Sequence, residues 1–418
     1  MIQRLKPKSE FSRNVLTLMT GTSIAQAIPI AISPILTRIY TPEDFGIFAI
    51  YMSIAAIISV IATGRYEMAI MLPAKDEEVN SLVKLILLML SSVTLVLFLI
   101  VFLFNAQITS LFDNKEISNW LYFLPVSIFL VGIYQVFNYL LIREKNFKRL
   151  AKNKVIVSIT NGSTQLLIGL SLQNSFGFLL GNILGYIVSI YFIFKSQVIN
   201  KYFKFKNLPI KNVAKKYNNF PKYDLPSVLV NVLANQLPIL TFGKFFGLGV
   251  LGSYALMYKV LMMPINLLSN TILDVFKQRA TEDYNKYGNC KEIYIKTFKR
   301  LILIGIIPFS ILGVFAPNIF TFIFGDQWKV AGEFAQIMTP MFYVKFVISP
   351  LSYTFFIVNK QKFNFYGQIF LFFGTLVSVI LSIYYKNEYI LIVLFSLNYI
   401  FIYIIYLILS FKFSKGTI

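Results

Sequence analysis

Four basic side chains lie within or at the ends of long apolar stretches of this sequence, where a charge is costly. Lys259 and Lys345 lie well inside such stretches, and Arg38 and Arg65 lie near the ends of two others. A cation in the core of a bilayer costs at least ~2.5–3.5 kcal/mol, so it persists only beside water, a counter-ion or an anionic ligand. Arg38 and Arg65 have an alternative explanation, because basic side chains near helix ends also extend to the headgroups. All four side chains are candidate ligands for an anion such as a diphosphate.

Amide side chains recur beside these cations at helical spacing. Residues 259, 266, 270 and 274 share one ~80° stripe of a predicted helix, and similar polar stripes follow residues 22–33 and 224–235. In lipid such groups also bond helices to one another, at ~0.6 kcal/mol per bond. We favour a cationic, hydrogen-bonding cavity suited to sugar hydroxyls. Its candidate residues are Gln26, Asn231, Asn235, Asn266 and Asn270.

Three carboxylates are candidates for ion coupling. Glu67, Asp224 and Asp274 lie at the ends of apolar stretches, where a carboxylate exchanges a proton or binds Na⁺, although most carboxylates at helix ends are solvated caps. The chain has no His and one Cys, Cys290, which excludes Ser-His-Asp triads, intrachain disulfides and His or Cys metal clusters. We therefore expect neither a metal nor a cofactor, and we leave coupling to H⁺ or Na⁺ open.

These residues must be positioned by membrane helices. Hydrophobic residues make up 57% of the 418 residues and charged residues 14%, against ~45–50% and ~25% in soluble proteins. Twelve apolar segments each approach the ~20 residues that cross a bilayer. The sequence thus predicts an all-α membrane protein with twelve transmembrane helices. They span residues 14–38, 45–64, 82–104, 119–142, 155–172, 176–194, 225–243, 250–275, 299–316, 331–358, 363–384 and 389–411.

The Lys and Arg residues fall in every second gap between these segments. Alternate gaps, counting both terminal segments, hold 32 of the 39 cations. By the positive-inside rule, these gaps and both termini are cytoplasmic. The net charge of +21 then reflects loops that face anionic headgroups rather than nucleic acid. We expect a multi-pass membrane protein with membrane lipids among its partners and no nucleic-acid partner.

The chain divides into two similar halves. The basic segment 195–222 separates residues 1–194 from residues 223–418, and each half has six predicted helices. The stretch IAQAIPI (residues 24–30) aligns with LANQLPI (233–239), and GIFA (46–49) aligns with GSYA (252–255). We expect two parallel six-helix repeats, related by an axis along the membrane normal. Pro29 and Pro238 occupy equivalent positions and are candidate hinges, because proline kinks a helix.

Three stretches resemble Wzx-type polysaccharide flippases, the oligosaccharide transporters of the MOP (MATE-like) superfamily. The junction of the first two helices in that family is similar to LTRIYTPEDFGIFAIY (residues 36–51). The start of its second six-helix lobe is similar to FPKYDLPSVLVNVLANQLPIL (residues 220–240) and GVLGSYALMYKVLMMPINLLSNTILDVFKQRA (residues 249–280). These are patterns of apolar, Gly and Pro positions, and together with the helix count they cover essentially the whole chain.

The resemblance implies two six-helix lobes in a V around a cationic cavity. It also implies alternating access that carries an undecaprenyl-diphosphate-linked oligosaccharide to the outer leaflet of the bacterial inner membrane, for O-antigen, capsule or another polymer. Cavity cations of such flippases correspond to Arg38, Arg65 and Lys259. Lys345 is added only because it lies mid-way along its apolar segment. Other glycan-assembly membrane proteins are implied partners. Lipid II flippases have two further helices, which argues against that substrate.

Two other functions stay open. Cation-coupled drug exporters of the same superfamily favour acidic cavities, whereas this cavity is predicted to be basic. Membrane glycan polymerases and ligases hold their reaction site in a large outer loop, whereas the longest outer gap here is residues 105–118. Without such a loop or a paired-carboxylate motif, we expect a transporter and not an enzyme.

Overall fold

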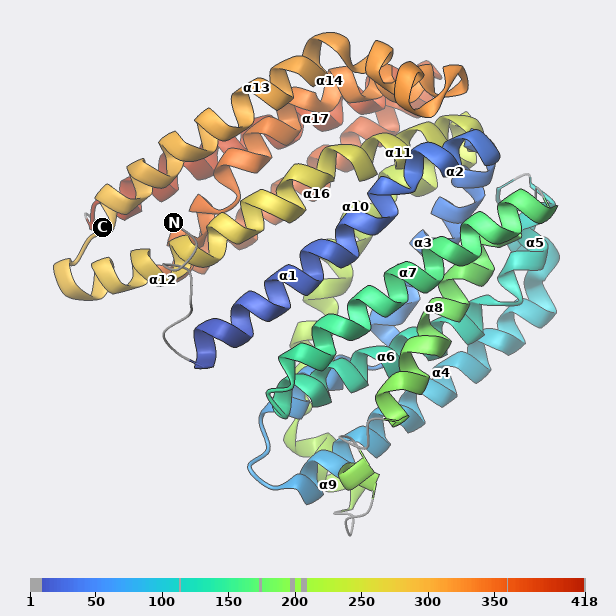
Figure 1. Cartoon of the computed structure of the whole chain (residues 1–418), viewed down its shortest axis with the longest axis horizontal. Helices are drawn as coiled ribbons and strands as arrows, with labels where there is room; N and C mark the ends of the chain where they lie inside the picture. Colours follow the sequence, from blue (N-terminus) through green and yellow to red (C-terminus); the bar gives the residue numbers. More distant parts are fainter. Residues whose placement is uncertain are drawn as a thin grey trace. The chain divides into compact units, whose positions relative to one another are not determined.

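The apolar stretches form long helices (Figure 1). The computed structural model describes residues 10–112, 114–172, 175–195, 200–203, 209–358 and 360–416, and in these ranges it contains no strand. The α-helices are α1 (Glu10–Ala31), α2 (Ser33–Ile39), α3 (Pro42–Ala62), α4 (Asp76–Ser110), α5 (Glu116–Leu121), α6 (Leu124–Arg143), α7 (Phe147–Leu172), α8 (Phe176–Lys195), α9 (Ile210–Lys216), α10 (Leu225–Thr241), α11 (Leu248–Pro264), α12 (Asn270–Tyr287), α13 (Lys291–Phe324), α14 (Lys329–Ile348), α15 (Thr354–Ile357), α16 (Gln361–Tyr385) and α17 (Glu388–Ser414).

The chain is a multi-pass membrane protein. Among the described residues, 10 helices are long and apolar enough to span a bilayer, and 11 if the bent pair Asp326–Ile348 and Leu351–Ile357 counts as one span. The predicted segment 155–172 is helical within α7, but α7 is not among these spans. Its polar residues lower its hydropathy, and it packs against both α1 and α8. Twelve spans and cytoplasmic termini stay predictions.

The helices assemble into two units. Unit 1 comprises Met1–Tyr40 and Ile47–Gln236, and unit 2 comprises Thr41–Gly46 and Leu237–Ile418. In unit 1, α7 packs against α1 and α8, and α6 packs against α4 and α8. In unit 2, α14 packs against α11, α13 and α17, and α16 packs against α17 (Figure 1). The predicted boundaries at residues 194/195 and 222/223 stay predictions.

Part of the predicted linker is attached to unit 1. The short helix α9 packs on α4, where Lys216 Nζ lies 2.5 Å from Glu78 Oε1 and the Tyr217 hydroxyl donates to the same oxygen at 3.0 Å. Tyr66 donates to the carbonyl oxygen of Ala214 at 3.1 Å. These contacts hold α9 beside the first turn of α4. The π-helix η4 (Phe220–Asp224) follows α9 and leads directly into α10.

Two glycines make reciprocal backbone contacts in unit 2. A Cβ on Gly46 would collide with the Leu248 carbonyl, and a Cβ on Gly252 would collide with the Pro42 carbonyl. The sequence separation between Gly46 and Gly252 equals the separation between Pro42 and Leu248. Each glycine therefore lies against the carbonyl of the residue four positions before the other glycine, where α3 and α11 begin. Only glycine permits so close an approach of two backbones.

Proline lies inside α1 and α10, the helices that hold the two candidate hinges. Pro29 lacks an N–H, so the carbonyl of Ala25 has no donor within α1. The Ser158 hydroxyl of α7 donates to that carbonyl, which is how membrane proteins satisfy a backbone group freed by proline. Pro238 lies inside α10 and is buried. Both predicted hinge positions are thus interior helix positions, and their hinge role stays a prediction.

Candidate functional site

Arg65 lies in a tight turn between α3 and the 3₁₀-helix η2 (Tyr66–Met71). Gly64 and Arg65 both have left-handed backbone conformations, with φ of 57° and 63°. This conformation costs a non-glycine residue about 1–2 kcal/mol. Strain of this kind persists where the surrounding contacts hold the side chain in one place, and it is concentrated at functional sites.

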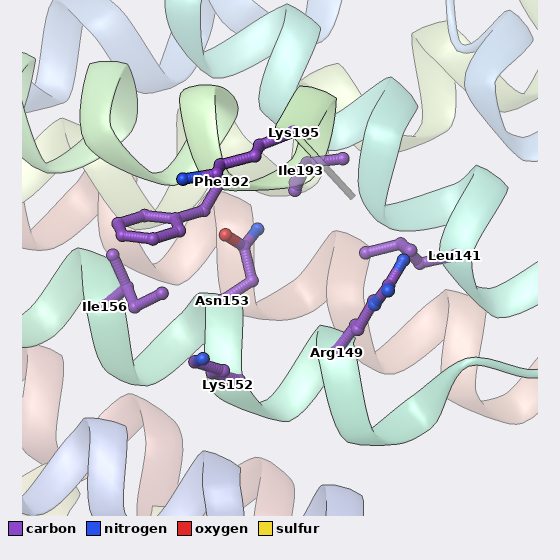
Figure 2. Close-up of a pocket in the computed structure, with 8 residues that line it drawn as sticks. All are labelled: Leu141, Arg149, Lys152, Asn153, Ile156, Phe192, Ile193 and Lys195. Carbon is purple, nitrogen blue, oxygen red and sulfur yellow. The ribbon is translucent and has the colours of Figure 1, made fainter. Parts of the chain in front are cut away.

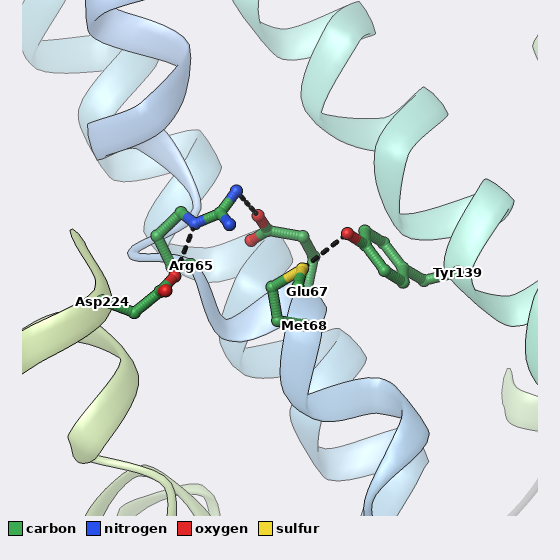
Figure 3. A network of polar contacts seen from close by, with 5 residues as sticks. All are labelled: Arg65, Glu67, Met68, Tyr139 and Asp224. Carbon is green, nitrogen blue, oxygen red and sulfur yellow. Dashed lines mark hydrogen bonds and ion pairs between the residues drawn. The ribbon is translucent and has the colours of Figure 1, made fainter. Parts of the chain in front are cut away.

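The guanidinium of Arg65 joins two carboxylates (Figure 3). Arg65 Nε donates to Asp224 Oδ2 at 2.8 Å, and Nη1 donates to Glu67 Oε1 at 3.2 Å. Burial acts to lower the pKa of Arg65, but the hydrogen bond to Asp224 and the negative charges of Glu67 and Asp224 outweigh it, so the pKa is raised. All three residues belong to unit 1. The structure brings together one predicted substrate cation and two of the predicted coupling carboxylates.

Glu67 is the buried member of this triad. Its side chain is 2% exposed, against 21% for Arg65 and 39% for Asp224. Its second oxygen, Oε2, is buried and has no hydrogen-bond partner, and the same is true of the Thr63 hydroxyl one turn earlier. A buried carboxylate oxygen without a donor is a position for a proton, a water molecule or a cation.

A cavity of about 270 Å³ opens beside the triad within unit 1. Ser59, Arg65, Glu67, Gln135 and Tyr186 form its polar part, and apolar side chains of α3 form much of the rest. Tyr139 donates to the sulfur of Met68 at 2.5 Å on the other side of Glu67 (Figure 3). Gln135 and Tyr186 were not predicted from the sequence, since a lone Gln or Tyr in an apolar helix has no distinguishing signal.

Lys259 and Lys345 lie in unit 2, on α11 and α14, and both side chains are partly buried. Within the described part of the chain, neither lysine has an ion pair. The Nζ atom of Lys345 lies 5.9 Å from the ring centres of both Phe342 and Tyr399, which is within the range of a cation–π interaction. These two lysines therefore differ from Arg65, whose charge is already neutralised.

Tyrosines gather around Lys345. Tyr258 packs edge-on against Phe342 with ring centres 5.6 Å apart, and Tyr399 stacks on Tyr403 at 6.2 Å. The hydroxyls of Tyr258, Tyr399 and Tyr403 have no hydrogen-bond partner among the described residues. Such groups are able to bond sugar hydroxyls, and their rings are able to stack on a sugar face. Tyr258 is next to Lys259 in the sequence. The contact between Lys345 and Tyr399 of α17 was not predictable from residue spacing.

A polar seam between α1 and α7 was also missed. Lys154 of α7 donates to the Thr22 hydroxyl of α1 at 3.0 Å, and within α7 Gln165 donates to Asn161 Oδ1 at 2.5 Å. One helical turn after Thr22, the Oε1 atom of Gln26 is buried without a partner. The spacing of residues 154, 158, 161 and 165 along one helix face was the available signal. Gln26 is therefore the predicted amide with the clearest unsatisfied group.

The other predicted residues are scattered. Arg38 is exposed in the last turn of α2. Asn231 and Asn235 are exposed on α10, and Asn235 donates to the Asn231 carbonyl at 2.8 Å. Asn266 lies in the π-helix η6 (Ile265–Ser269) that follows Pro264. The side chains of Asn270 and Asp274 lie outside the described residues.

The sequence matches a protein family over most of this helical region. The model of the family described as "Polysaccharide biosynthesis protein" matches residues 35–333. The chain belongs to the polysaccharide biosynthesis protein family. This range contains Arg38, Arg65, Asp224 and Lys259, and it ends before Lys345.

Two curated relatives carry related descriptions. The teichuronic acid biosynthesis protein TuaB of Bacillus subtilis (strain 168) is 21% identical over 265 residues, which cover 61% of this chain and 52% of TuaB. The amylovoran biosynthesis protein AmsL of Erwinia amylovora is 24% identical over 116 residues, covering 28% of this chain and 30% of AmsL. The match thus spans about half the length of TuaB and less than a third of AmsL.

Solved structures share the fold. An inward-facing multidrug resistance MATE family transporter of the MOP superfamily has a TM-score of 0.71 at 13% identity and covers 95% of this chain and 94% of its own. The lipid II flippase MurJ, in an inward closed conformation, has a TM-score of 0.68 at 14% identity, covering 97% and 89%. The family model thus supports the predicted resemblance to a polysaccharide biosynthesis family, and the predicted MOP-type fold is shared with these structures. By their descriptions, these two neighbours are a transporter and a flippase.

Proposed function

We propose that this protein moves a lipid-linked oligosaccharide across the bacterial inner membrane. The lipid carrier is undecaprenyl diphosphate, the direction is from the cytoplasmic to the outer leaflet, and the mechanism is alternating access. A diphosphate that leaves the headgroup region enters an apolar slab, where an unpaired anion is very costly. The protein must therefore offer cations whose charge is not already neutralised.

The observation that carries the proposal is the absence of an ion pair at Lys259 and Lys345 among the described residues, although both side chains are partly buried in membrane helices. Arg38, exposed at the end of α2, supplies a further cation. The tyrosine hydroxyls around Lys345 supply sugar-binding groups in the same unit. A charged diphosphate and a glycan have matched partners here, whereas a hydrophobic drug cation does not.

The triad in unit 1 is proposed to couple transport to H⁺ or Na⁺. Glu67 Oε2 has no partner, and protonation or Na⁺ binding at Glu67 would remove the charge that holds Arg65 Nη1. Arg65 would then be free to exchange Asp224, its more exposed partner, for a phosphate oxygen. A bidentate guanidinium is suited to that exchange. The identity of the glycan and any partnership with other glycan-assembly proteins follow from the same proposal and rest on the relatives' descriptions.

The test substitutes the two lysines without touching the triad. Lys259→Gln and Lys345→Gln remove charge and keep a polar side chain, while Lys329→Gln, an exposed position on the same helix as Lys345, is the matched control. We expect the double variant to lose surface polysaccharide and to accumulate lipid-linked oligosaccharide, at unchanged protein level, and we expect Lys259→Arg to retain most activity. Normal surface polysaccharide in the double variant would overturn the proposal.

The same variants distinguish the proposed flippase from the alternative function, cation-coupled drug export. Drug exporters of this fold would use Glu67 and Asp224 as the acidic residues that bind a cationic substrate. In that case the lysine variants keep their function, and a Glu67→Gln variant fails to extrude a fluorescent organic cation from vesicles. Loss of glycan export with no effect on cation extrusion supports the flippase.

A further inference from the structure

A second cavity in unit 1 is lined by basic residues. It has a volume of about 200 Å³ and lies among the last turns of α6, the first turns of α7 and the last turn of α8 (Figure 2). Arg149, Lys152 and Lys195 contribute to its wall, and none of the described residues that line it is acidic. Three cations around one small cavity repel each other, so an anion within it is favoured.

The position of two of these cations is unfavourable for their own helix. Arg149 and Lys152 lie in the first turns of α7, and no acidic residue lies in the first turn of that helix. The N-terminal end of a helix carries a partial positive charge and stabilises anions. An anion in the cavity would therefore be favoured by the side chains and by the end of α7 together. Lys195 is different, because a cation in the last turn of α8 is ordinary.

The cavity combines a polar floor with apolar walls. Asn153 is 3% exposed and accepts a hydrogen bond from Ser189, and its Nδ2 lies 3.4 Å from Asn138 Oδ1, a long contact. In Figure 2 its amide points into the space between the side chains of α7 and α8. Ile156 and Phe192 line one side. A small inorganic anion would use the cations alone, whereas a ligand with a phosphate and a hydrocarbon part would use both surfaces.

The predicted topology places this cavity at the cytoplasmic headgroup level. Residues 143–154 and 195–222 are two of the cation-rich gaps of the sequence. Anionic phospholipids give the cytoplasmic leaflet a negative surface, and basic pockets between membrane helices on that side bind lipid headgroups. The lipid would enter sideways along Ile156 and Phe192 without leaving the bilayer.

We propose that this cavity is a binding site for an anionic phospholipid, whose phosphate contacts Arg149, Lys152 and Lys195 and whose glycerol and acyl chains lie along Ile156 and Phe192. The proposal does not depend on the substrate of the transporter, because none of these residues belongs to the triad or to the lysine and tyrosine cluster of unit 2. Its failure would leave the proposed function intact, and the reverse also holds.

The experiment measures lipid binding to the purified full chain in a non-ionic detergent. Native mass spectrometry follows the titration of phosphatidylglycerol, with phosphatidylcholine as the zwitterionic comparison and inorganic phosphate as the free anion. We expect one phosphatidylglycerol to bind at least tenfold more tightly than phosphatidylcholine. The variant Arg149→Gln/Lys152→Gln/Lys195→Gln should lose this preference, with a loss of about fivefold for each cation removed.

The matched control removes three exposed cations elsewhere. Lys291→Gln/Lys296→Gln/Lys299→Gln makes the same change in net charge on α13. None of these three lysines lines either of the two cavities of unit 1. It should keep the preference for phosphatidylglycerol. Equal loss in both triple variants would show diffuse attraction and overturn the site, as would an unchanged preference in the first variant. Displacement of the lipid by millimolar inorganic phosphate would identify a free-anion site instead. If the triple variant fails to fold, Lys152→Gln alone, an exposed position, carries the same test.

Discussion

The buried ion pair between Arg65 and Glu67 predicts an unusual order of stability among four proteins. Arg65→Ala removes the only cation paired with Glu67 in the described residues and leaves a carboxylate that is 2% exposed. Breaking a buried pair in this way costs about 3–5 kcal/mol. Because the Arg65 side chain is 21% exposed, water screens part of the interaction, and we expect about 3 kcal/mol. Alanine also keeps the Cβ, so the left-handed backbone strain is unchanged.

Neutralising the stranded carboxylate should restore much of this loss. In Arg65→Ala/Glu67→Gln the amide has no charge to bury, so the double variant should be about 2 kcal/mol more stable than Arg65→Ala alone. The pair with Asp224, which is 39% exposed, should contribute about 1 kcal/mol or less. Asp224→Asn is therefore expected to be nearly as stable as the wild type. The order from most to least stable is wild type, Asp224→Asn, the double variant and Arg65→Ala.

Fluorescence-detected size-exclusion chromatography of heated, detergent-solubilised protein measures this order. For a unit of this size, 3 kcal/mol corresponds to roughly 6–12 °C in melting temperature. Lys329→Ala is the control, because the Lys329 side chain is exposed at the start of α14, and no shift is expected. A double variant as unstable as Arg65→Ala, or an Arg65→Ala variant that melts with the wild type, would refute the buried-pair reasoning.

Three further predictions test other features. Gly252→Ala forces a Cβ onto the Pro42 carbonyl and should destabilise the protein by at least ~1–3 kcal/mol in the same melting assay. Gly313→Ala is its control, because the nearest atom lies 3.7 Å from the added Cβ, and it should be neutral or stabilising by up to ~1 kcal/mol. Cys290 is 1% exposed, and burial, together with the nearby Asp283, raises the pKa of its thiol to about 11. Maleimide labelling at pH 8 should therefore be at least about a hundredfold slower in the folded than in the unfolded protein. The free energy of unfolding linked to this thiol is fully present below pH 9 and is lost as the pH rises through 11. Cysteines introduced at residues 145 and 285 of a Cys290→Ser variant should be labelled from the cytoplasm and one at residue 326 from outside, and external labelling at 145 would contradict the topology.

The helices were predictable because their signal is local. Each of the twelve apolar segments lies on a helix or on consecutive helices of the structure, since in lipid a chain must satisfy its own backbone. The repeat stays a prediction from GIFA and GSYA, and the reciprocal contacts of Gly46 and Gly252 lie in these two stretches. Only glycine fits at such a close backbone contact, which agrees with a glycine at the start of both stretches.

The partners of the charged residues were not predictable. Arg65 and Asp224 are 159 residues apart in the chain, and no periodicity links a loop after α3 to the start of α10. The three π-helices η4, η5 (Phe242–Phe246) and η6 were also missed, because a one-residue shift in hydrogen bonding depends on neighbouring helices and not on residue type. The sequence placed Arg65 and Glu67 in different roles, and the structure joins them.

Arg65 in unit 1 is ion-paired, whereas Lys259 and Lys345 in unit 2 have no ion pair among the described residues, and this difference bears on which residues supply affinity for the substrate. An arginine that is already bonded to two carboxylates gains little from a phosphate unless one bond is first broken. A partly buried lysine without an ion pair has already lost hydration on folding, so an incoming diphosphate restores an interaction that is missing. Under the proposed function, Lys259 and Lys345 then supply the steady affinity for the diphosphate, while Arg65 binds only when Glu67 is neutralised. Substrate affinity should therefore vary with pH or Na⁺ in the wild type and lose that dependence in Glu67→Gln, without losing the contribution of the lysines.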